Sequence, residues 1–306
     1  MKTPRLAVPL AMVIAPFICS AQDIAGSPPP VVTAKAWAVA DAKTGEVLWA
    51  RNADEKRKSA STTKMMCAWT VLRLAEKQPS VLDERVTFSE LAGSTNGTGA
   101  GIKAGESLPV RDCLRGLLLP SGNDAGNALA EHFNARFDPP DADMLRAGLD
   151  DPKLATRVNF IAEMNRHARA FGMKDTIYRS SFGDGGTERD RTTTARDLLR
   201  LAQATMQSPA FREIVATKHY ECEVRRPDGG TRKAAWDNTN KLLAVDPAYD
   251  GIKTGMTNQA GNCLVASGHL RGDRLFVVVL GCDTEDSRFT DARSLFRWAW
   301  TQRKGR

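Results

Sequence analysis

Two apolar segments near the C-terminal end constrain the fold of this chain more than any other feature. NCLVASG (262–268) and LFVVVLGC (275–282) flank a short polar turn at 270–274, a pattern that predicts an antiparallel hairpin. Near the start, AWAVADAKTGEVLWARNA alternates apolar and polar residues around a turn at 43–46, which predicts two further strands. Strands are therefore expected at both ends of the chain.

Between these ends, apolar residues recur at helical spacing. Helices are expected from STTKMMCAWTVLRLAE (61–76), on both sides of PSGN (120–123), and over 156–171 and 193–206. A final helix carries one apolar stripe, formed by Ala292, Leu295, Phe296 and Ala299. This order predicts an α+β protein, with an antiparallel sheet joined by both termini, N- and C-terminal helices and a helical subregion. Residues 137–155, rich in Pro and Asp, are expected to form a surface excursion.

The N-terminal segment has the order of a secretory signal. Lys2 and Arg5 precede an apolar stretch that ends at Ile18, and small residues follow at Cys19 and Ala21. We expect a signal peptide over 1–21, a linker over 22–33 and a single domain over 34–306 without an additional C-terminal β domain, and an uncleaved anchor is the alternative. Losing Lys2 and Arg5 lowers the formal net charge from +7 to +5. An exported, periplasmic or extracytoplasmic basic protein would meet anionic wall polymer or membrane rather than nucleic acid.

Five cysteines lie beyond the signal: Cys67, Cys113, Cys222, Cys263 and Cys282. None forms C-x-x-C and none has a histidine at zinc-ligand spacing, so neither a metal nor another cofactor is expected. Buried small apolar side chains are favoured over a bridge between Cys263 and Cys282.

Ser61 and Lys64 are a candidate nucleophile and base. The chain has four histidines but neither a G-x-S-x-G elbow nor H-E-x-x-H, so histidine-based and zinc-based hydrolysis have no local support. A spacing of three at a helix start puts Ser61 and Lys64 on one face, about one turn apart. Alone, the pair is better explained as an N-cap serine with a surface lysine.

Two further motifs occur twice each, and their positions distinguish the copies. Ser94–Asn96 lies in a Gly-rich stretch without apolar support, whereas Ser121–Asn123 links two apolar helices that could hold it rigidly. The K-T-G at 43–45 is the tip of a turn, whereas the K-T-G at 253–255 lies along a strand that leads into the hairpin. The second copy of each motif is therefore the functional candidate.

Together with their flanks, these motifs resemble the penicillin-recognising serine peptidases, specifically the low-molecular-mass D-alanyl-D-alanine carboxypeptidases. The resemblance runs from about Ala34 to Arg297 and is carried by DAKTGEVLWARNADEKRKSASTTKMM, LLLPSGNDAGNALAEH and YDGIKTGMTNQAGNCLVASG. It implies the fold of β-lactamases and D,D-peptidases. It also implies removal of the terminal D-alanine from peptidoglycan stem peptides that end in D-Ala-D-Ala, with β-lactams as covalent inhibitors.

By this resemblance Ser61 is the nucleophile, Lys64 its base and Ser121 the group that passes a proton to the leaving amine. An ordinary lysine, with a pKa of ~10.4, is a poor base at pH 7. Burial and a nearby cation, Lys253, would have to disfavour the charged form of Lys64. Asn123 would orient Lys64 and the substrate amide.

The remaining implied roles concern substrate binding. Lys253 and Thr254 would hold the terminal carboxylate, and Gly255 would leave room for the peptide along the strand edge. The backbone N–H groups of Ser61 and Met256 would stabilise the oxyanion.

Several departures and alternatives remain. RSSFGDGG replaces the N-P-H-G-L-like loop of the family, which leaves the contacts of 180–186 open. The basic end RWAWTQRKGR implies at most weak membrane contact, because Trp298 and Trp300 fit packing roles.

A D,D-endopeptidase that cleaves cross-links is an alternative, since the motifs do not define which amine leaves. A class A β-lactamase fits less well, because FGMKDTIYRSSFGDGG lacks a deacylating glutamate. A non-catalytic wall-binding protein is disfavoured by the full set of catalytic side chains.

Overall fold

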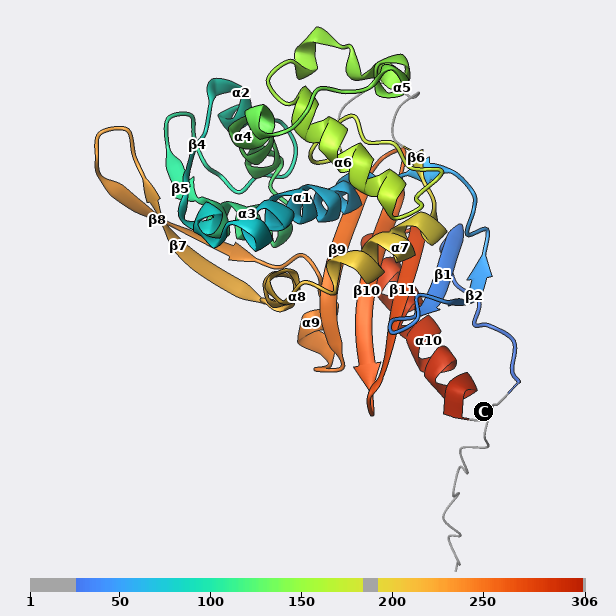
Figure 1. The fold of residues 1–306 in the computed structure, drawn as a ribbon. Helices are drawn as coiled ribbons and strands as arrows, with labels where there is room; N and C mark the ends of the chain where they lie inside the picture. The colour runs from blue at the N-terminus through green and yellow to red at the C-terminus, as the bar shows by residue number, and fades with distance from the viewer. Residues whose placement is uncertain (1–25, 184–191, 305–306) are drawn as a thin grey trace, which may run out of the picture.

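A five-stranded antiparallel sheet forms the centre of the molecule. In the computed structural model, which describes residues 26–183 and 192–304, its strand order is β2-β1-β11-β10-β9 (Figure 1). The strands are β1 (Ala36–Asp41), β2 (Val47–Arg51), β9 (Tyr249–Thr257), β10 (Gly261–Leu270) and β11 (Asp273–Cys282). Because β1 pairs with β11, the sheet joins the two ends of the chain, as the sequence predicted.

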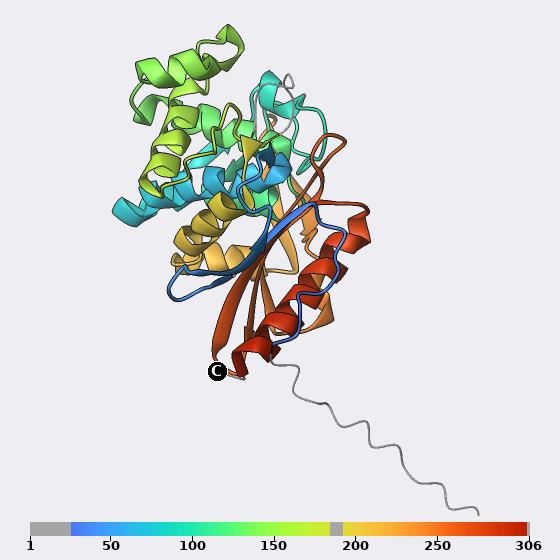
Figure 2. The same ribbon diagram turned by 90° about the vertical axis from the view of Figure 1, so that its right-hand side faces the viewer.

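Both faces of this sheet are covered by helices. Helix α10 (Glu285–Lys304) packs on one face, and α7 (Ala195–Thr205) packs on the other (Figures 1 and 2). Alternate residues of β11 contribute to different cores: Val277 and Val279 to the one under α10, Val278 and Leu280 to the one under α7. A strand buried on both faces has no polar side to display, which explains the continuous apolar run LFVVVLGC.

The helical subregion lies beyond one end of the sheet (Figure 1). Its central helix α1 (Lys64–Lys77) is buried at every position from 64 to 72. The surrounding elements are η1 (Ala60–Thr63), η2 (Pro79–Asp83), α2 (Glu90–Gly93), α3 (Val110–Leu118), α4 (Asn123–Phe133), η3 (Asn134–Arg136), α6 (Val158–Ala170) and α8 (Pro209–Ala216). Short pieces join the two regions, namely β3 (Arg57–Lys58), β6 (Thr192–Thr193) and α9 (Leu242–Val245).

One feature differs from the expected fold. A second, four-stranded sheet, β4-β5-β7-β8, is formed by β4 (Arg85–Thr87), β5 (Ser107–Pro109), β7 (His219–Arg225) and β8 (Thr231–Asp237). Most residues of β7 and β8 are exposed or half-buried, so this hairpin carries no apolar run that would predict it. Among the described residues no helix precedes β1, and residues 1–25 lie outside them, so the expected N-terminal helix stays a prediction; the α+β class is confirmed.

Residues 137–155 form the expected excursion on the outside of the helical subregion (Figure 1). They comprise α5 (Ala142–Met144), the π-helical turn η4 (Leu145–Leu149) and η5 (Pro152–Leu154). Met144 and Leu149 are buried and anchor it, while most of its other residues are exposed or half-buried.

The cysteines and tryptophans have structural roles. Cys263 belongs to the core under α7 and Cys282 to the core under α10, and all five described cysteines are free, so the Cys263–Cys282 bridge is not formed. Trp298 packs edge-on against Trp49, and the Trp300 indole N–H donates to the Asp273 carbonyl, as packing residues would.

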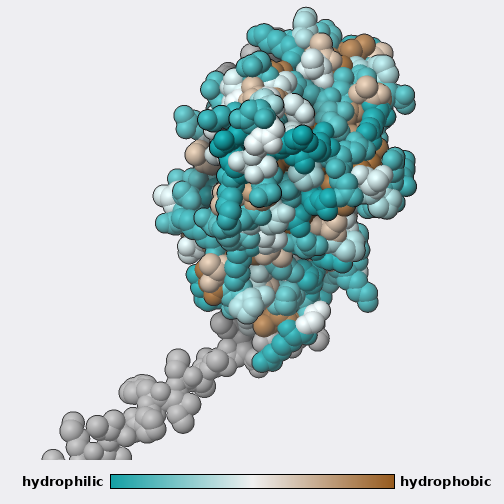
Figure 3. Space-filling model, turned by 90° about the vertical axis from the view of Figure 1, so that its left-hand side faces the viewer, coloured by the Kyte–Doolittle hydropathy of each residue, from teal (hydrophilic) through white to brown (hydrophobic). Residues whose placement is uncertain are grey.

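In residues 26–183 and 192–304, no helix combines the length and the apolar character that crossing a membrane requires. Figure 3 shows one face of the molecule as mostly hydrophilic, with hydrophobic residues in small scattered groups. The expected signal peptide at 1–21 lies outside the described residues.

Candidate active site

Ser61 lies in the 3-10 turn η1, directly before α1. Neither η1 nor α1 is capped by a side chain, and Lys64 is completely buried, so the N-cap serine with a surface lysine is the wrong interpretation. The Lys64 Nζ and Ser61 Oγ atoms are 2.7 Å apart. Ala60 has a φ of +45°, a left-handed conformation that bends the chain into this turn.

The second motif approaches Lys64 from the connection between α3 and α4. The Lys64 Nζ lies 3.3 Å from Ser121 Oγ and 2.7 Å from Asn123 Oδ1. Ser121 also has a left-handed backbone, with a φ of +68°. Such strained residues persist only where the surrounding structure fixes them, and they are common at functional sites.

The Gly-rich stretch at 94–102 fixes this connection, a role that the sequence did not suggest. The Thr98 hydroxyl donates to the Ser121 carbonyl, and the Asn123 side chain donates to the Asn96 carbonyl. The Asp124 carboxylate in turn accepts hydrogen bonds from the backbone N–H groups of residues 100–102. The stretch treated as a plain loop therefore clamps the second motif, and Thr98 lines the cleft beside it.

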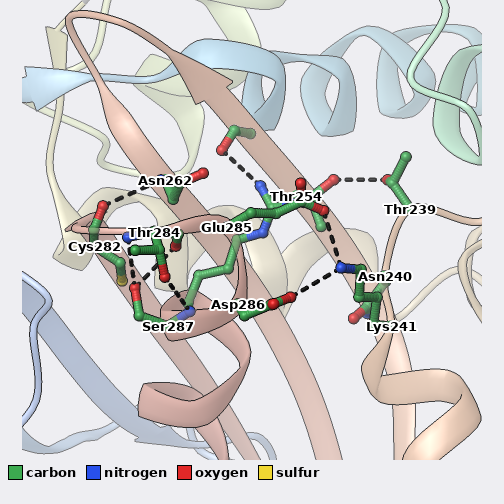
Figure 4. Close-up of polar contacts among 12 residues, drawn as sticks. Thr239, Asn240, Lys241, Thr254, Asn262, Cys282, Thr284, Glu285, Asp286 and Ser287 are labelled. Atoms are coloured by element: carbon green, nitrogen blue, oxygen red, sulfur yellow. Dashed lines mark hydrogen bonds and ion pairs between the residues drawn. The ribbon is translucent and has the colours of Figure 1, made fainter.

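Strand β9 brings the third motif to the opposite wall. Lys253 is 1% exposed, and its Nζ lies 3.4 Å from the Thr254 hydroxyl, which is 2.7 Å from the Thr239 hydroxyl (Figure 4). A Cβ at Gly255 would lie 3.2 Å from the Ser61 backbone nitrogen. The missing side chain thus leaves room for the turn that carries Ser61, and room for the peptide along the strand edge stays a prediction.

The two buried lysines disfavour each other's charge. Burial lowers the pKa of Lys253 well below its ordinary value, and the nearby charges of Lys64 and Arg288 lower it further. We expected Lys253 to carry a charge that keeps Lys64 neutral. Because both amines are buried, they are better described as a coupled pair that resists holding two positive charges.

Three side-chain oxygens surround the Lys64 amine. Its Nζ donates to Ser61 Oγ, Ser121 Oγ and Asn123 Oδ1. A charged amine can donate all three of these bonds, and a neutral amine could donate two and accept the Ser61 O–H with its lone pair. The geometry thus puts both serine hydroxyls within proton-transfer distance of Lys64.

The motifs meet at a single cleft of about 560 Å³. Ser61, Ser121, Thr254, Gly255 and Met256 line it, and the Met256 side chain, 56% exposed, lies at its surface. Three further predicted residues are buried behind this lining. Lys64 contacts Ser121, Lys253 contacts Thr254, and Asn123 contacts Lys64. The structure therefore brings together the predicted residues from three distant parts of the sequence.

Arg288 of α10 is a site residue that the motif analysis missed. It lines the cleft, is 5% exposed, and donates to the Gly255 carbonyl with an Nη1–O distance of 3.3 Å. Its other amino group lies 3.3 Å from the Glu285 carboxylate. One signal could have revealed it: Arg288 falls one turn before Ala292 on the apolar stripe of this helix, where a charge is unusual.

The segment that replaces the family's usual loop still supports the nucleophile turn. The Ser180 hydroxyl accepts hydrogen bonds from the backbone N–H groups of Phe182 and Gly183. The Phe182 ring lies 5.8 Å from Lys64 Nζ, and a Cβ at Gly183 would collide with the Ala60 carbonyl. Residues 184–186 lie outside the described residues.

Comparison with known proteins identifies relatives of this chain. The family described as D-alanyl-D-alanine carboxypeptidase matches residues 23–136 and 155–284, and thus passes over the surface excursion. A Bacillus subtilis protein named D-alanyl-D-alanine carboxypeptidase DacF is 28% identical over 88% of this chain, but the match spans only 62% of that relative. A Pseudomonas aeruginosa protein named D-alanyl-D-alanine endopeptidase is 30% identical over 86% of this chain and 76% of its own length.

A solved structure is similar along nearly its whole length. The crystal structure of the Streptomyces K15 DD-transpeptidase matches with a TM-score of 0.78 and 30% identity, covering 90% of this chain and 99% of that one. A protein of Streptomyces sp. (strain K15) named D-alanyl-D-alanine carboxypeptidase is 31% identical over 84% of this chain and 84% of its own length. This chain therefore belongs to the D-alanyl-D-alanine carboxypeptidase family.

Proposed function

We propose that this protein is a serine D,D-carboxypeptidase that removes the terminal D-alanine of peptidoglycan stem peptides through a Ser61 acyl-enzyme. The observation that carries the proposal is the hydrogen-bonded set Ser61–Lys64–Ser121 at the floor of one cleft. A hydroxyl becomes a nucleophile when an adjacent base accepts its proton, and Lys64 is in position to do so.

Acylation then follows from the geometry. The Ser61 Oγ attacks the carbonyl of the penultimate D-alanine while its proton passes to Lys64, and Ser121 returns a proton to the departing amine. The backbone N–H groups of Ser61 and Met256 stabilise the oxyanion, each at a typical value of about 3 kcal/mol. Water then hydrolyses the ester and frees Ser61.

The substrate's terminal carboxylate is held at the Thr254 hydroxyl. The Arg288 guanidinium, fixed to the Gly255 carbonyl, supplies a charge beside it. Because Lys253 lies next to Thr254, an incoming carboxylate favours the charged form of Lys253, which burial disfavours in the free protein. Binding of the carboxylate and protonation of Lys253 are thus coupled.

The proposal includes the cellular setting. The N-terminal pattern supports export to the periplasm or another extracytoplasmic space, with cleavage near Ala21, a linker over 22–33 and a catalytic domain over 34–306. In that setting the partners are stem peptides that end in D-Ala-D-Ala, and β-lactams acylate Ser61 in place of the peptide.

Labelling with a fluorescent penicillin tests the proposal. Wild type should be labelled and should release D-alanine from a monomeric pentapeptide, whereas Ser61→Ala should lose both properties and still fold. Ser94→Ala, which changes the other S-x-N copy at an exposed position, is the matched control and should behave as wild type. Labelling of Ser61→Ala at the wild-type rate would refute Ser61 as the nucleophile.

A further inference from the structure

The β7–β8 hairpin contacts the stretch that clamps the second motif. It extends away from the five-stranded sheet, and its strand β8 lies at the edge of the four-stranded sheet (Figure 1). The Trp236 indole N–H donates to the Ala100 carbonyl with an N–O distance of 2.8 Å. Arg232 Nη2 donates to the Gly101 carbonyl at 2.7 Å. The proposed reaction uses neither side chain, so these two bonds have no role in it so far.

Both bonds end on peptide groups whose N–H side faces Asp124. The peptide group with the Ala100 carbonyl also contains the Gly101 N–H, whose nitrogen lies 2.9 Å from Asp124 Oδ2. The next peptide group contains the Gly101 carbonyl and the Ile102 N–H, whose nitrogen lies 3.2 Å from the same oxygen. Each β8 side chain is therefore joined to the Asp124 carboxylate through one peptide group. Hydrogen bonds in such a chain polarise one another.

Asp124 is buried and takes its hydrogen bonds from the backbone. Its carboxylate accepts from four N–H groups, those of Ala100, Gly101, Ile102 and Ala125. A buried carboxylate needs such donors, because burial removes the water that would otherwise solvate it. Asp124 follows Asn123 directly in the first turn of α4. Contacts that hold residues 100–102 on Asp124 therefore also hold the second motif.

The position of the Ser121 hydroxyl depends on this stretch. Ser121 has the left-handed backbone given above, and its carbonyl accepts from the Thr98 hydroxyl. The Asn123 N–H in turn donates to the Thr98 carbonyl at 2.8 Å. Of the three oxygens around the Lys64 amine, Ser121 Oγ is the most distant, at 3.3 Å. A shift of a few tenths of an ångström would end this contact as a hydrogen bond.

The two β8 side chains are themselves held in place. Arg232 Nε lies 2.6 Å from the carboxylate of Glu106, which is buried and also accepts from the Lys103 N–H. The buried Trp236 ring packs against α3, where a Cβ at Gly116 would lie 3.2 Å from it. Side chains locked in this way can fix the peptide groups that they contact.

We propose that Trp236 and Arg232 are positioning residues for Ser121. They hold the peptide groups of residues 100–102 against Asp124 and thereby keep the Ser121 hydroxyl within reach of Lys64. The inference rests on the proposed function, in which Ser121 passes a proton to the departing amine. It gives the four-stranded sheet, which the sequence did not predict, a part in that proton transfer.

Trp236→Phe tests the bond to Ala100, because it keeps a ring but loses the indole N–H. It should lower kcat for release of D-alanine from the monomeric pentapeptide about 3- to 10-fold and leave KM within about twofold. Trp300→Phe is the matched control: it loses an indole N–H bond to the Asp273 carbonyl, beside the β10–β11 turn, and should behave as wild type. Expressing kcat per penicillin-labelled site removes any contribution from unfolded protein. A wild-type kcat in Trp236→Phe, or a change in KM alone, would overturn the inference.

Substitution of Arg232 tests the second bond in the same assay. Arg232→Met should lower kcat about 3- to 10-fold, and Arg232→Lys should lower it less, because an ammonium group can still donate to the Gly101 carbonyl. Lys233→Met removes the same charge at the exposed neighbouring position of β8 and should leave kcat unchanged. Equal losses in Lys233→Met and Arg232→Met would mean that charge near the hairpin, and not the hydrogen bond, matters.

A double-substitution cycle separates positioning of Ser121 from a general loosening of the fold. Trp236→Phe should slow penicillin labelling of Ser61 about 3- to 10-fold in wild type, but less than about twofold in Ser121→Ala, where no hydroxyl remains to be positioned. The same loss in both backgrounds would show that Trp236 acts elsewhere. If folded wild type is neither labelled nor able to release D-alanine, the proposed function itself fails. If it does both and neither Trp236→Phe nor Arg232→Met changes kcat, only the inference fails.

Discussion

The lysines of the inner cleft and the lysine at its rim occupy opposite surroundings. Lys64 and Lys253 are buried and contact hydroxyl and amide oxygens, whereas Lys241 is exposed and lies between two carboxylates. In the inner cleft, burial and repulsion between the lysines disfavour the charged form of Lys253, whereas at the rim hydrogen bonds to Asp286 and Glu285 favour the charged form of Lys241. We therefore expect the same residue type to act as a base inside the cleft and to stay charged at its rim.

The largest effect is expected from removing the inner base. Lys64→Arg keeps a positive side chain but cannot supply a neutral amine, so acylation of Ser61 by penicillin should fall by about 10³–10⁴. Stopped-flow labelling measures this rate, and circular dichroism checks the fold. Lys43→Arg, in the other K-T-G copy, should keep the wild-type rate. A loss below tenfold in Lys64→Arg would mean that another group accepts the proton.

A smaller effect is expected at Arg288, which lies between Gly255 and Glu285 in the cleft. Arg288→Gln should lower kcat/KM for a peptide with a free terminal carboxylate by about 10- to 100-fold, because a charge-assisted contact is lost. For the same peptide with an amidated end, wild type and Arg288→Gln should differ much less. Equal losses on both peptides would show that Arg288 acts only by holding Gly255, without binding the carboxylate.

The smallest effect concerns stability and contrasts the two lysine environments directly. A lysine whose pKa is lowered by folding binds its proton less tightly in the folded state, so its burial costs stability below the unfolded pKa of ~10.4, and the cost shrinks as the pH approaches that value. Lys253→Met should therefore raise the free energy of unfolding at pH 7 by about 1–3 kcal/mol, and by less at pH 10. Urea denaturation at both pH values measures this. Lys241→Met, at the exposed rim, should shift the melting temperature by less than about 3 °C.

Much of the site could be predicted from the sequence because the motif copies differ in their surroundings. Ser121 lies between two apolar helices and Lys253 lies beside a buried hairpin, so apolar patterning separated them from Ser94 and Lys43. Arg288 and Thr98 escaped prediction, because each reaches the site through a tertiary contact with a distant segment. The reason for Gly255 also came only from the structure, since the Ser61 nitrogen that it faces is far away in sequence.

The fold likewise contains some strands that the apolar pattern of the sequence predicted and others that it did not. Strands buried on both faces, such as β11, have a continuous apolar pattern and could be predicted from it. The β7–β8 hairpin could not, because its exposed and half-buried strands are held by backbone pairing, which is nearly independent of side-chain pattern. Thr284, which lines the cleft, and Ser287 cap the start of α10 reciprocally, and the sequence analysis attached no function to this pair.

The most direct test of the coupled lysine pair is the rate at which penicillin acylates Ser61, measured from pH 5 to pH 10 in wild type and in Lys253→Gln. If buried Lys64 is the base and Lys253 opposes its charge, the wild-type rate reaches its plateau well below pH ~10.4, and removing Lys253 moves the rise to higher pH. A wild-type rate that keeps climbing to pH 10, or a rise at the same pH in Lys253→Gln, would contradict the account.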